Sequence, residues 1–147
     1  MPSNPSASSP QVAKRMKQQR RRDTSAELAL RRELFRRGRR YRVDFHVSGK
    51  RRRVDIAFTR SMVAVFVDGC FWHRCPEHFT IPKANREWWI AKLEGNQTRD
   101  RETDQELREL GWAVVRVWEH ERVGTAADRV EAILRFRADQ AAAIPST

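Results

Sequence analysis

The apolar run Met62-Val63-Ala64-Val65-Phe66-Val67 leads directly into Asp68-Gly69-Cys70-Phe71-Trp72-His73-Arg74-Cys75-Pro76-Glu77-His78. Six consecutive apolar residues predict a strand in the middle of a sheet, buried on both faces. The residues that follow include two cysteines, two histidines and an adjacent aromatic pair. Such side chains bind metals, transfer protons and stack on other rings. We therefore expect a functional loop at the end of the central strand.

The residues before this run predict a helix and a hairpin. Thr24-Ser25-Ala26-Glu27 has the pattern of a capping box, with Thr24 as the N-cap of a helix that Gly38 ends. Apolar residues then recur every three or four positions, as a half-buried helix requires. Residues 41–47 and 53–59 alternate apolar and polar side chains, which predicts two strands of a hairpin.

The residues after the loop predict a long helix, a strand and a second helix. The long helix covers 85–110, with Asn85 as its N-cap and Gly111 just beyond its end. A strand at 112–118 and a helix at 125–138 follow. The inward face of the long helix is polar in its middle, so it is expected to pass beside a polar site. This face comprises Trp89, Leu93, Asn96, Asp100, Thr103, Leu107 and Leu110.

The order of these elements predicts one α/β domain, a small mixed sheet flanked by helices, over residues 23–139. Residues 1–22 are expected to be a disordered basic arm and 140–147 a flexible tail. The arm would contact phosphates through Lys14, Arg15, Lys17, Arg20, Arg21 and Arg22.

The charge of the chain is concentrated in its first third. The formal net charge of the 147 residues is +11, and residues 1–53 hold 17 of the 30 Lys and Arg but only 4 of the 19 acids. A basic region of this kind favours a polyanionic partner, nucleic acid rather than an anionic membrane. There is neither an apolar run long enough to span a membrane nor an apolar signal core, so a cytoplasmic, nucleoid-associated protein is expected.

The cysteines and histidines have the spacing of a metal site. Cys70, Cys75 and His78 supply three ligands of the types that zinc prefers. His120, which follows the last predicted strand, is the favoured fourth ligand, and His73 is its competitor. The alternatives are a disulfide between the cysteines, or buried thiols beside surface histidines.

Two acids and a histidine are the candidates for catalysis. Asp55 and Asp68 lie in or at the end of neighbouring strands, where two carboxylates can hold Mg²⁺. His73 has an imidazole suited to taking a proton from water. On spacing alone, Glu27 belongs to the capping box, and Asp55 has an alternative role as an outward-facing acid paired with Arg53.

Aromatic side chains lie close to these candidates. Phe71 and Trp72 stand in the loop between a zinc ligand and the candidate base, where exposed rings can enter a DNA base step. Trp88 and Trp89 lie near the start of the long helix. Core packing is the alternative role for each of the four.

Several of these motifs together resemble the very short patch repair endonucleases. The resemblance covers roughly residues 14–123 in unbroken order. Its motifs are Asp68-Gly-Cys-Phe-Trp-His73, Glu87-Trp88-Trp89 with Lys92 and Asn96, Arg99-Asp100, Leu110-Gly111-Trp112 and Val117-Trp118-Glu119. It implies a restriction-endonuclease-like fold. It also implies Mg²⁺-dependent nicking of the T-containing strand of a T:G mismatch, 5′ of the T, where 5-methylcytosine has deaminated.

The resemblance also implies roles for individual residues. Position by position, it assigns Mg²⁺ binding to Asp55 and to the backbone carbonyl of Val67, and catalysis to His73 with Glu27 near the site. It further implies intercalation by Phe71, Trp72 and Trp89, and a structural zinc held by Cys70, Cys75, His78 and His120.

The chain departs from the best-known pattern of the family at Asp68, where that pattern has a second histidine before Gly-Cys-Phe-Trp-His. This makes Asp68 a possible second Mg²⁺ ligand and shifts the site toward that of ordinary restriction endonucleases. Residues 36–40, which are rich in arginine, would hold phosphates together with the arm.

The favoured hypothesis is a monomeric mismatch endonuclease acting on double-stranded DNA, with mismatch-repair helper proteins as further partners. The alternatives are a sequence-specific restriction-type nuclease of the same fold, and a non-catalytic zinc module that binds DNA.

Overall fold

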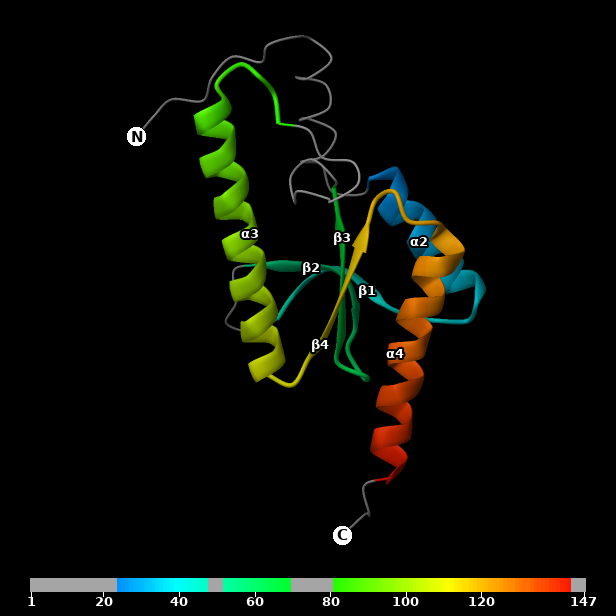
Figure 1. Cartoon of the computed structure of the whole chain (residues 1–147). Coiled ribbons are helices and arrows are strands. Elements are labelled where there is room, and N and C mark those ends of the chain that lie inside the picture. The colour runs from blue at the N-terminus through cyan, green and yellow to red at the C-terminus, as the bar shows by residue number, and fades with distance from the viewer. Residues whose placement is uncertain (1–23, 48–51, 70–80, 144–147) are drawn as a thin grey trace.

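The computed structural model describes residues 24–47, 52–69 and 81–143. Four strands form one mixed sheet in the order β1-β2-β3-β4, in which β3 and β4 are parallel and the other neighbours are antiparallel (Figure 1). This confirms the predicted mixed sheet flanked by helices, an architecture compatible with a restriction-endonuclease-like fold. The elements are α2 (Ser25–Arg36), β1 (Arg42–His46), β2 (Arg53–Phe58), β3 (Val63–Asp68), α3 (Arg86–Glu109), β4 (Ala113–Trp118) and α4 (Val123–Ala143).

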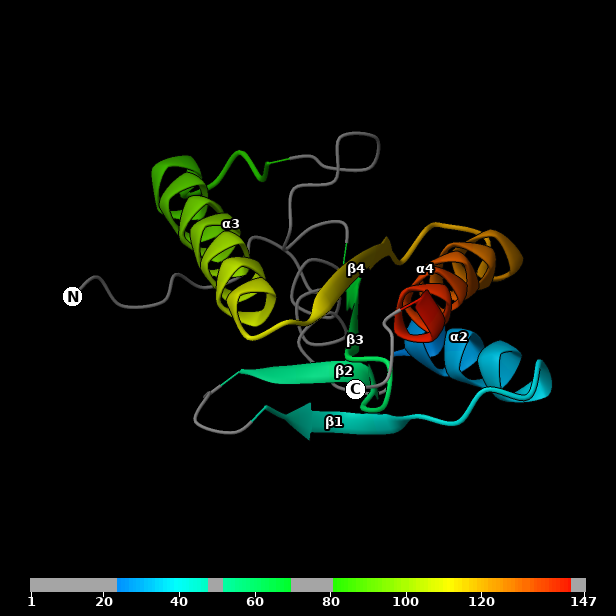
Figure 2. The same ribbon diagram turned by 90° about the horizontal axis from the view of Figure 1, so that it is seen from below.

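Helices cover both faces of the sheet. The helices α2 and α4 pack on one face and α3 packs on the other, as the view from below makes plain (Figure 2). On β3 the side chains alternate between the faces, because successive residues of a strand point to opposite sides. Val63 and Val65 join the core under α2 and α4, whereas Ala64 and Phe66 join the core under α3. The central strand is therefore buried on both faces, as predicted.

The first helix begins where the capping box predicts. The hydroxyl of Thr24 accepts a hydrogen bond from the backbone N–H of Glu27 at 3.3 Å, and Thr24 is the N-cap of α2. This contact satisfies one of the donors that a helix start leaves without an intrahelical partner. Glu27 is buried, with 6% of the residue exposed.

An arginine fastens α2 to α4. Arg37 donates to Glu33 at 2.9 Å within its own helix end, and to Asp128 at 2.7 Å and Glu131 at 3.0 Å on α4. Arg39 also donates to Glu131, at 3.1 Å. Arg37 and Arg39 were among the arginines expected to hold phosphates, and in the structure they join α2 to α4.

The inward face of α3 agrees with the predicted stripe except at one end. Trp89, Leu93, Thr103 and Leu107 are buried. Leu110, in contrast, is 45% exposed, so its predicted place in the core is wrong. Leu110 is the residue after the helix, and Gly111, at φ +93°, turns the chain there so that Trp112 enters the core.

The boundaries of α3 agree with the prediction, whereas α4 is longer than predicted. Asn85 occupies the N-cap position of α3 in a left-handed conformation, at φ 58°, and its side chain makes no capping hydrogen bond. The last helix begins at Val123 and continues to Ala143, so residues 140–143 of the predicted tail are helical. In the described part of the chain, no helix is both long and apolar enough to cross a membrane.

Candidate active site

The hydrogen-bonded pairing of strands β2 and β3 ends next to Asp55. Their pairing runs from Phe58 opposite Val63 to Ile56 opposite Val65. Beyond that point, the Oδ2 atom of Asp55 accepts a hydrogen bond from the backbone N–H of Val67 at 2.9 Å. A carboxylate thus takes the place of a strand-to-strand bond. The half-buried Asp55 side chain is held where the two strands diverge.

The carbonyl of Val67 points toward the same strand. In a strand the N–H and C=O groups of one residue point to the same side, and the side alternates along the chain. The carbonyls of Met62 and Asp68 accept bonds from β4 or the residue after it, at 2.8 Å from Ala113 and 2.9 Å from Glu119. Val67 therefore directs both of its backbone groups toward β2 and Asp55.

A carboxylate and a backbone carbonyl directed toward the same gap are oxygen donors of the kind that Mg²⁺ prefers. The structure brings together Asp55 and Val67, the two residues that the family resemblance assigned to magnesium. The residues present fit that ion, which the fold family implies.

The first turn of α2 approaches this strand end. A cavity of about 230 Å³ lies between α2 and the ends of β3 and β4, lined among others by Ser25, Ala26, Val67 and Trp118. Glu27 belongs to the same turn, and its carboxylate lies 3.6 Å from Arg31. The turn that carries Glu27 is thus next to the candidate site. A direct part for its carboxylate in catalysis stays a prediction.

Asp68 faces the other side of the sheet. Its buried carboxylate accepts hydrogen bonds from Nη1 of Arg116 on β4, at 2.9 and 3.2 Å. Arg116 also donates to Asp104 on α3, with Nε at 3.0 and 3.1 Å and Nη2 at 2.7 Å. The guanidinium lies 4.3 Å from the centre of the Phe66 ring. A role for Asp68 as a second magnesium ligand stays a prediction.

Sequence reasoning missed Arg116 and Asp104. Arg116 is the one charged residue in the apolar strand Ala113–Trp118, and a lone charge in such a strand requires a partner. Asp100 and Asp104 are four residues apart on α3 and so lie on one face of the helix. Together, these signals pointed to an ion cluster between β4 and α3.

The aromatic candidate on α3 is packed in the core. Trp89 is buried with Leu93, against Ile81 and Trp88, and the rings of Trp88 and Trp89 meet edge to face with centroids 4.7 Å apart. Core packing, the alternative to intercalation, thus describes Trp89 in the free protein. The other two aromatic candidates, Phe71 and Trp72, lie outside the described residues.

Most of the predicted zinc site also lies outside the described residues. This is true of Cys70, Cys75 and His78, of the candidate base His73, and of the basic residues between 14 and 22. His120 is described and is exposed just after β4. Among the described residues, no three His, Cys, Asp or Glu side chains gather as metal ligands.

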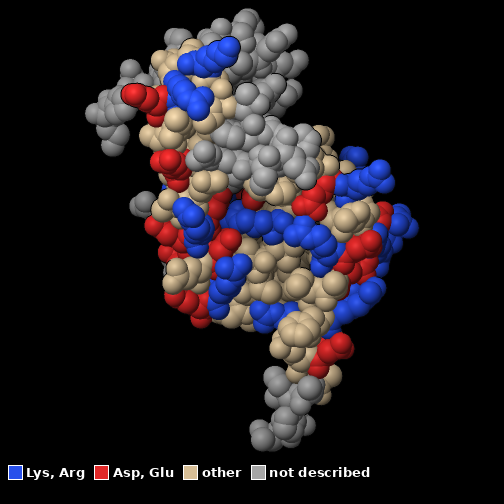
Figure 3. Space-filling view, viewed as in Figure 1, with Lys and Arg blue, Asp and Glu red and all other residues tan. Residues whose placement is uncertain are grey.

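On the face drawn in Figure 3, basic side chains are spread among acidic ones and do not form one continuous basic surface.

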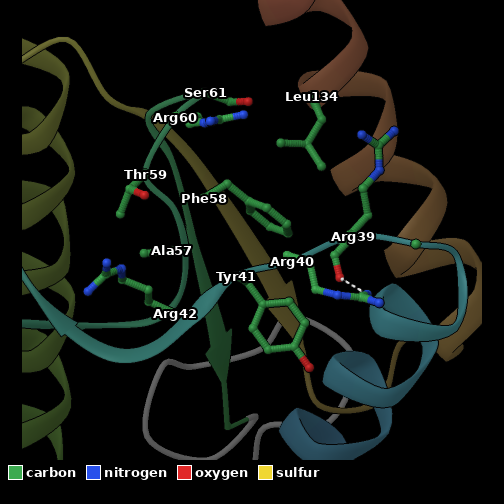
Figure 4. A pocket seen from close by; sticks show the side chains of 11 residues that line it. Arg39, Arg40, Tyr41, Arg42, Ala57, Phe58, Thr59, Arg60, Ser61 and Leu134 are labelled. Atoms are coloured by element: carbon green, nitrogen blue, oxygen red, sulfur yellow. Dashed lines mark hydrogen bonds between the residues drawn. The ribbon is translucent and has the colours of Figure 1, made fainter.

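A pocket of about 450 Å³ opens at the end of the sheet opposite Val67, where β2 turns into β3 (Figure 4). Its lining includes Arg39, Arg40, Arg42 and Arg60. Arg40 donates to the Arg39 carbonyl at 3.0 Å and lies over the Phe35 ring.

Comparisons with known proteins show the family to which the chain belongs. The family model "DNA mismatch endonuclease Vsr" matches residues 8–77. The type II nicking enzyme V.NaeI of Lentzea aerocolonigenes is 46% identical over 121 residues, which cover 80% of this chain and 73% of the relative. The type II nicking enzyme V.NmeDIP of Neisseria meningitidis is 40% identical over 77% of this chain and 76% of its own length. The DNA mismatch endonuclease Vsr of Escherichia coli is 37% identical, over 67% of this chain and 62% of its own length. The chain therefore belongs to the Vsr family of DNA endonucleases.

Proposed function

We propose that this DNA endonuclease nicks the T-containing strand of T:G mismatches, 5′ of the T, in a reaction that depends on Mg²⁺. The observation that carries the proposal is the placement of the Asp55 carboxylate and the Val67 carbonyl at the point where β2 and β3 diverge. The family model and one relative are both named as a DNA mismatch endonuclease, and this supports a mismatched DNA duplex as the substrate.

Asp55 and the carbonyl of Val67 would hold the ion. Bound Mg²⁺ would polarise the scissile phosphate and offset the charge that develops on it. The hydrogen bond from the Val67 N–H fixes one carboxylate oxygen of Asp55, so the metal-binding group does not have to be ordered when DNA arrives. His73 would take the proton from the attacking water.

The aromatic side chains would open the base stack beside the mismatch. Phe71, Trp72 and Trp89 are the proposed wedges, and a weakly paired T:G step is cheaper to distort than a matched step. Because Trp89 is buried in the free protein, its contact with DNA requires the Trp88–Trp89–Leu93 cluster to rearrange.

The remaining proposed contacts are those of basic residues with DNA phosphates and those of cysteine and histidine side chains with zinc. The basic residues between 14 and 22, with Arg36 and Arg40, would contact phosphates of the duplex. Cys70, Cys75, His78 and His120 would bind a zinc ion that orders the segment carrying His73. Their sulfur and nitrogen atoms are the donors that a structural zinc site uses.

A restriction-type nicking specificity is the second candidate. It is favoured by the names of the similar proteins V.NaeI and V.NmeDIP, which are type II nicking enzymes, and by Asp68, where the family resemblance leads us to expect a histidine. In this case the flanking sequence, and not the mismatch alone, would decide where the strand is cut.

A strand-resolved cleavage assay separates the two candidates. End-labelled duplexes carrying one T:G mismatch in varied contexts are incubated with Mg²⁺, beside matched duplexes and EDTA controls. A single nick 5′ of the mismatched T, absent from matched DNA and from EDTA, is the expected result. Cleavage of matched DNA at one sequence would support the restriction-type specificity and contradict the mismatch proposal.

A further inference from the structure

Asp68 and Arg116 form the most heavily bonded charged group in the described part of the site. Three carboxylates surround the guanidinium: Asp68 at 2.9 Å, Asp104 at 2.7 Å and Asp100 at 3.9 Å. The carbonyl of Asp100 accepts a further bond from Nη2 at 3.5 Å. The side chain of Arg116 is 22% exposed and that of Asp68 only 7%.

The charged state of Arg116 is secure in this environment. Burial by itself opposes a charge, but the hydrogen bonds that Arg116 donates to Asp104 and the attraction of Asp68, Asp100 and Asp104 together raise the pKa of Arg116. The ring face of Phe66, 4.3 Å away, adds a further favourable contact for a cation. The guanidinium is therefore a permanent positive charge at the centre of three carboxylates.

The three carboxylates are arranged around Arg116, and among the described residues no three such side chains gather as the ligands of a metal ion. In this chain the centre of the group is filled by a side chain. Both oxygens of Asp68 are bonded to Arg116, on the α3 face of β3. Val67, the neighbouring residue, directs its carbonyl toward β2. Asp68 and the Asp55–Val67 pair therefore lie in different surroundings, although Val67 and Asp68 are neighbours in the chain.

We propose that Arg116 is a resident counter-ion that keeps Asp68 out of the magnesium shell. Asp68 and Arg116 are then positioning residues: their contact ties the end of β3 to β4, and so fixes the Val67 carbonyl beside Asp55. The carboxylate of Asp68 binds a guanidinium instead of a metal. This inference rests on the proposed function and names the part that Asp68 has in it.

The inference predicts which substitutions change metal binding. Asp68→Asn should weaken the affinity of the full-length protein–duplex complex for Mn²⁺, measured by electron paramagnetic resonance, only slightly, because it disturbs the support of one neutral carbonyl ligand and removes no charged ligand. Asp55→Asn should weaken that affinity about tenfold or more, because it removes a charged ligand. A loss of Mn²⁺ affinity in Asp68→Asn equal to that in Asp55→Asn would make Asp68 a metal ligand and overturn the inference.

The positioning role is tested against a merely structural one with a matched control. Asp104→Asn removes a carboxylate that contacts the same guanidinium but lies on α3, away from Val67. Asp68→Asn should slow single-turnover nicking about tenfold at saturating Mg²⁺, since small displacements of reacting groups are costly. Asp104→Asn should lower the melting temperature while leaving the nicking rate almost unchanged. Equal slowing by both variants would reduce the network to a structural role.

Arg116→Met completes the design. Because it breaks the same contact, it should slow nicking as much as Asp68→Asn, and the double variant should be no slower than either. If Arg116→Met does not fold, the Asp68 and Asp104 variants still decide the question. If the unchanged protein does not nick T:G duplexes, the proposed function fails, while the Mn²⁺ measurements still test the surroundings of Asp68.

Discussion

The carboxylates of Asp55 and Asp68, on the two sides of β3, have different partners. On the β2 side, Asp55 accepts a hydrogen bond from the peptide N–H of Val67. On the β4 side, Asp68 accepts two bonds from the guanidinium of Arg116. A peptide N–H orients a carboxylate without adding a charge, whereas a guanidinium binds it and offsets one unit of negative charge. Asp55, which is oriented by the backbone, is therefore suited to bind a cation. Asp68, which is bonded to an arginine, is suited to hold strands together.

Asp55→Asn is expected to have the largest effect on activity. Loss of the carboxylate should reduce the single-turnover nicking rate about a thousandfold, because the metal stabilises the transition state by several kcal/mol. An asparagine oxygen can still accept the Val67 N–H, so the free energy of unfolding should change by less than about 1 kcal/mol. Quenched-flow or manual single-turnover assays measure the nicking rate, and urea denaturation measures the free energy of unfolding. Nicking at the normal rate would remove Asp55 from the metal site.

Arg116→Met should produce the largest loss of stability. It leaves Asp68, Asp100 and Asp104 together without their cation, and breaking a buried ion pair in this way costs about 3 kcal/mol. Urea denaturation of the metal-free protein measures the change. Asp104→Asn serves as the control and should cost less, because Asp68 keeps its partner. An unchanged urea midpoint for Arg116→Met would contradict the tie between β3, β4 and α3.

The arginine–carboxylate pairs at the end of α2 and between α2 and α4 predict that the stability of the protein depends on pH. Hydrogen bonds from Arg36 and Arg37 lower the pKa of Glu33 from 4.5 to about 2. Those from Arg37 and Arg39 also lower the pKa of Glu131. A carboxyl with a lowered pKa in the folded state stabilises the fold above its ordinary pKa. That contribution is lost as the pH falls through the lowered value.

Thermal unfolding should therefore become easier as the pH falls from 4.5 toward 2, by an amount smaller than the effect of Arg116→Met. Glu33→Gln isolates the effect, because the variant lacks the titrating group. Its melting temperature should be lower than that of the unchanged protein at neutral pH, and the two values should converge in acid. A constant gap across this range would show that Glu33 does not titrate with a lowered pKa.

Thr24→Ala should have the smallest effect. Removing the hydroxyl that accepts the Glu27 N–H should lower the free energy of unfolding by about 1 kcal/mol, the usual cost of losing an N-cap. Ser25→Ala, at an exposed position one residue later, is the control and should cost little. A lower nicking rate in Thr24→Ala at full folding would indicate that the first turn of α2, with Glu27, contributes to the site.

Local patterns in the sequence were enough to predict most of the fold. The capping box located α2, alternation located β1 and β2, and the apolar run located β3. Leu110 was predicted wrongly because helical spacing does not reveal where a turn at Gly111 redirects the chain. The full length of α4 was also underestimated, since its last turns carry no apolar stripe.

The candidate site was less predictable than the fold. The pairing of Asp55 with Val67 followed from family resemblance, and no local pattern reveals that a side chain replaces a strand-to-strand bond. The Asp68–Arg116 contact joins residues 48 positions apart, so spacing alone could not predict it. The burial of Trp89 likewise depends on the packing of α3 against neighbouring residues.

Anomalous diffraction from crystals of the protein with a T:G duplex and Mn²⁺ would test the central claim most directly. The account predicts an anomalous peak between the carboxylate of Asp55 and the carbonyl of Val67, with Asp68 still bonded to Arg116. A peak coordinated by Asp68, with Arg116 displaced, would contradict it.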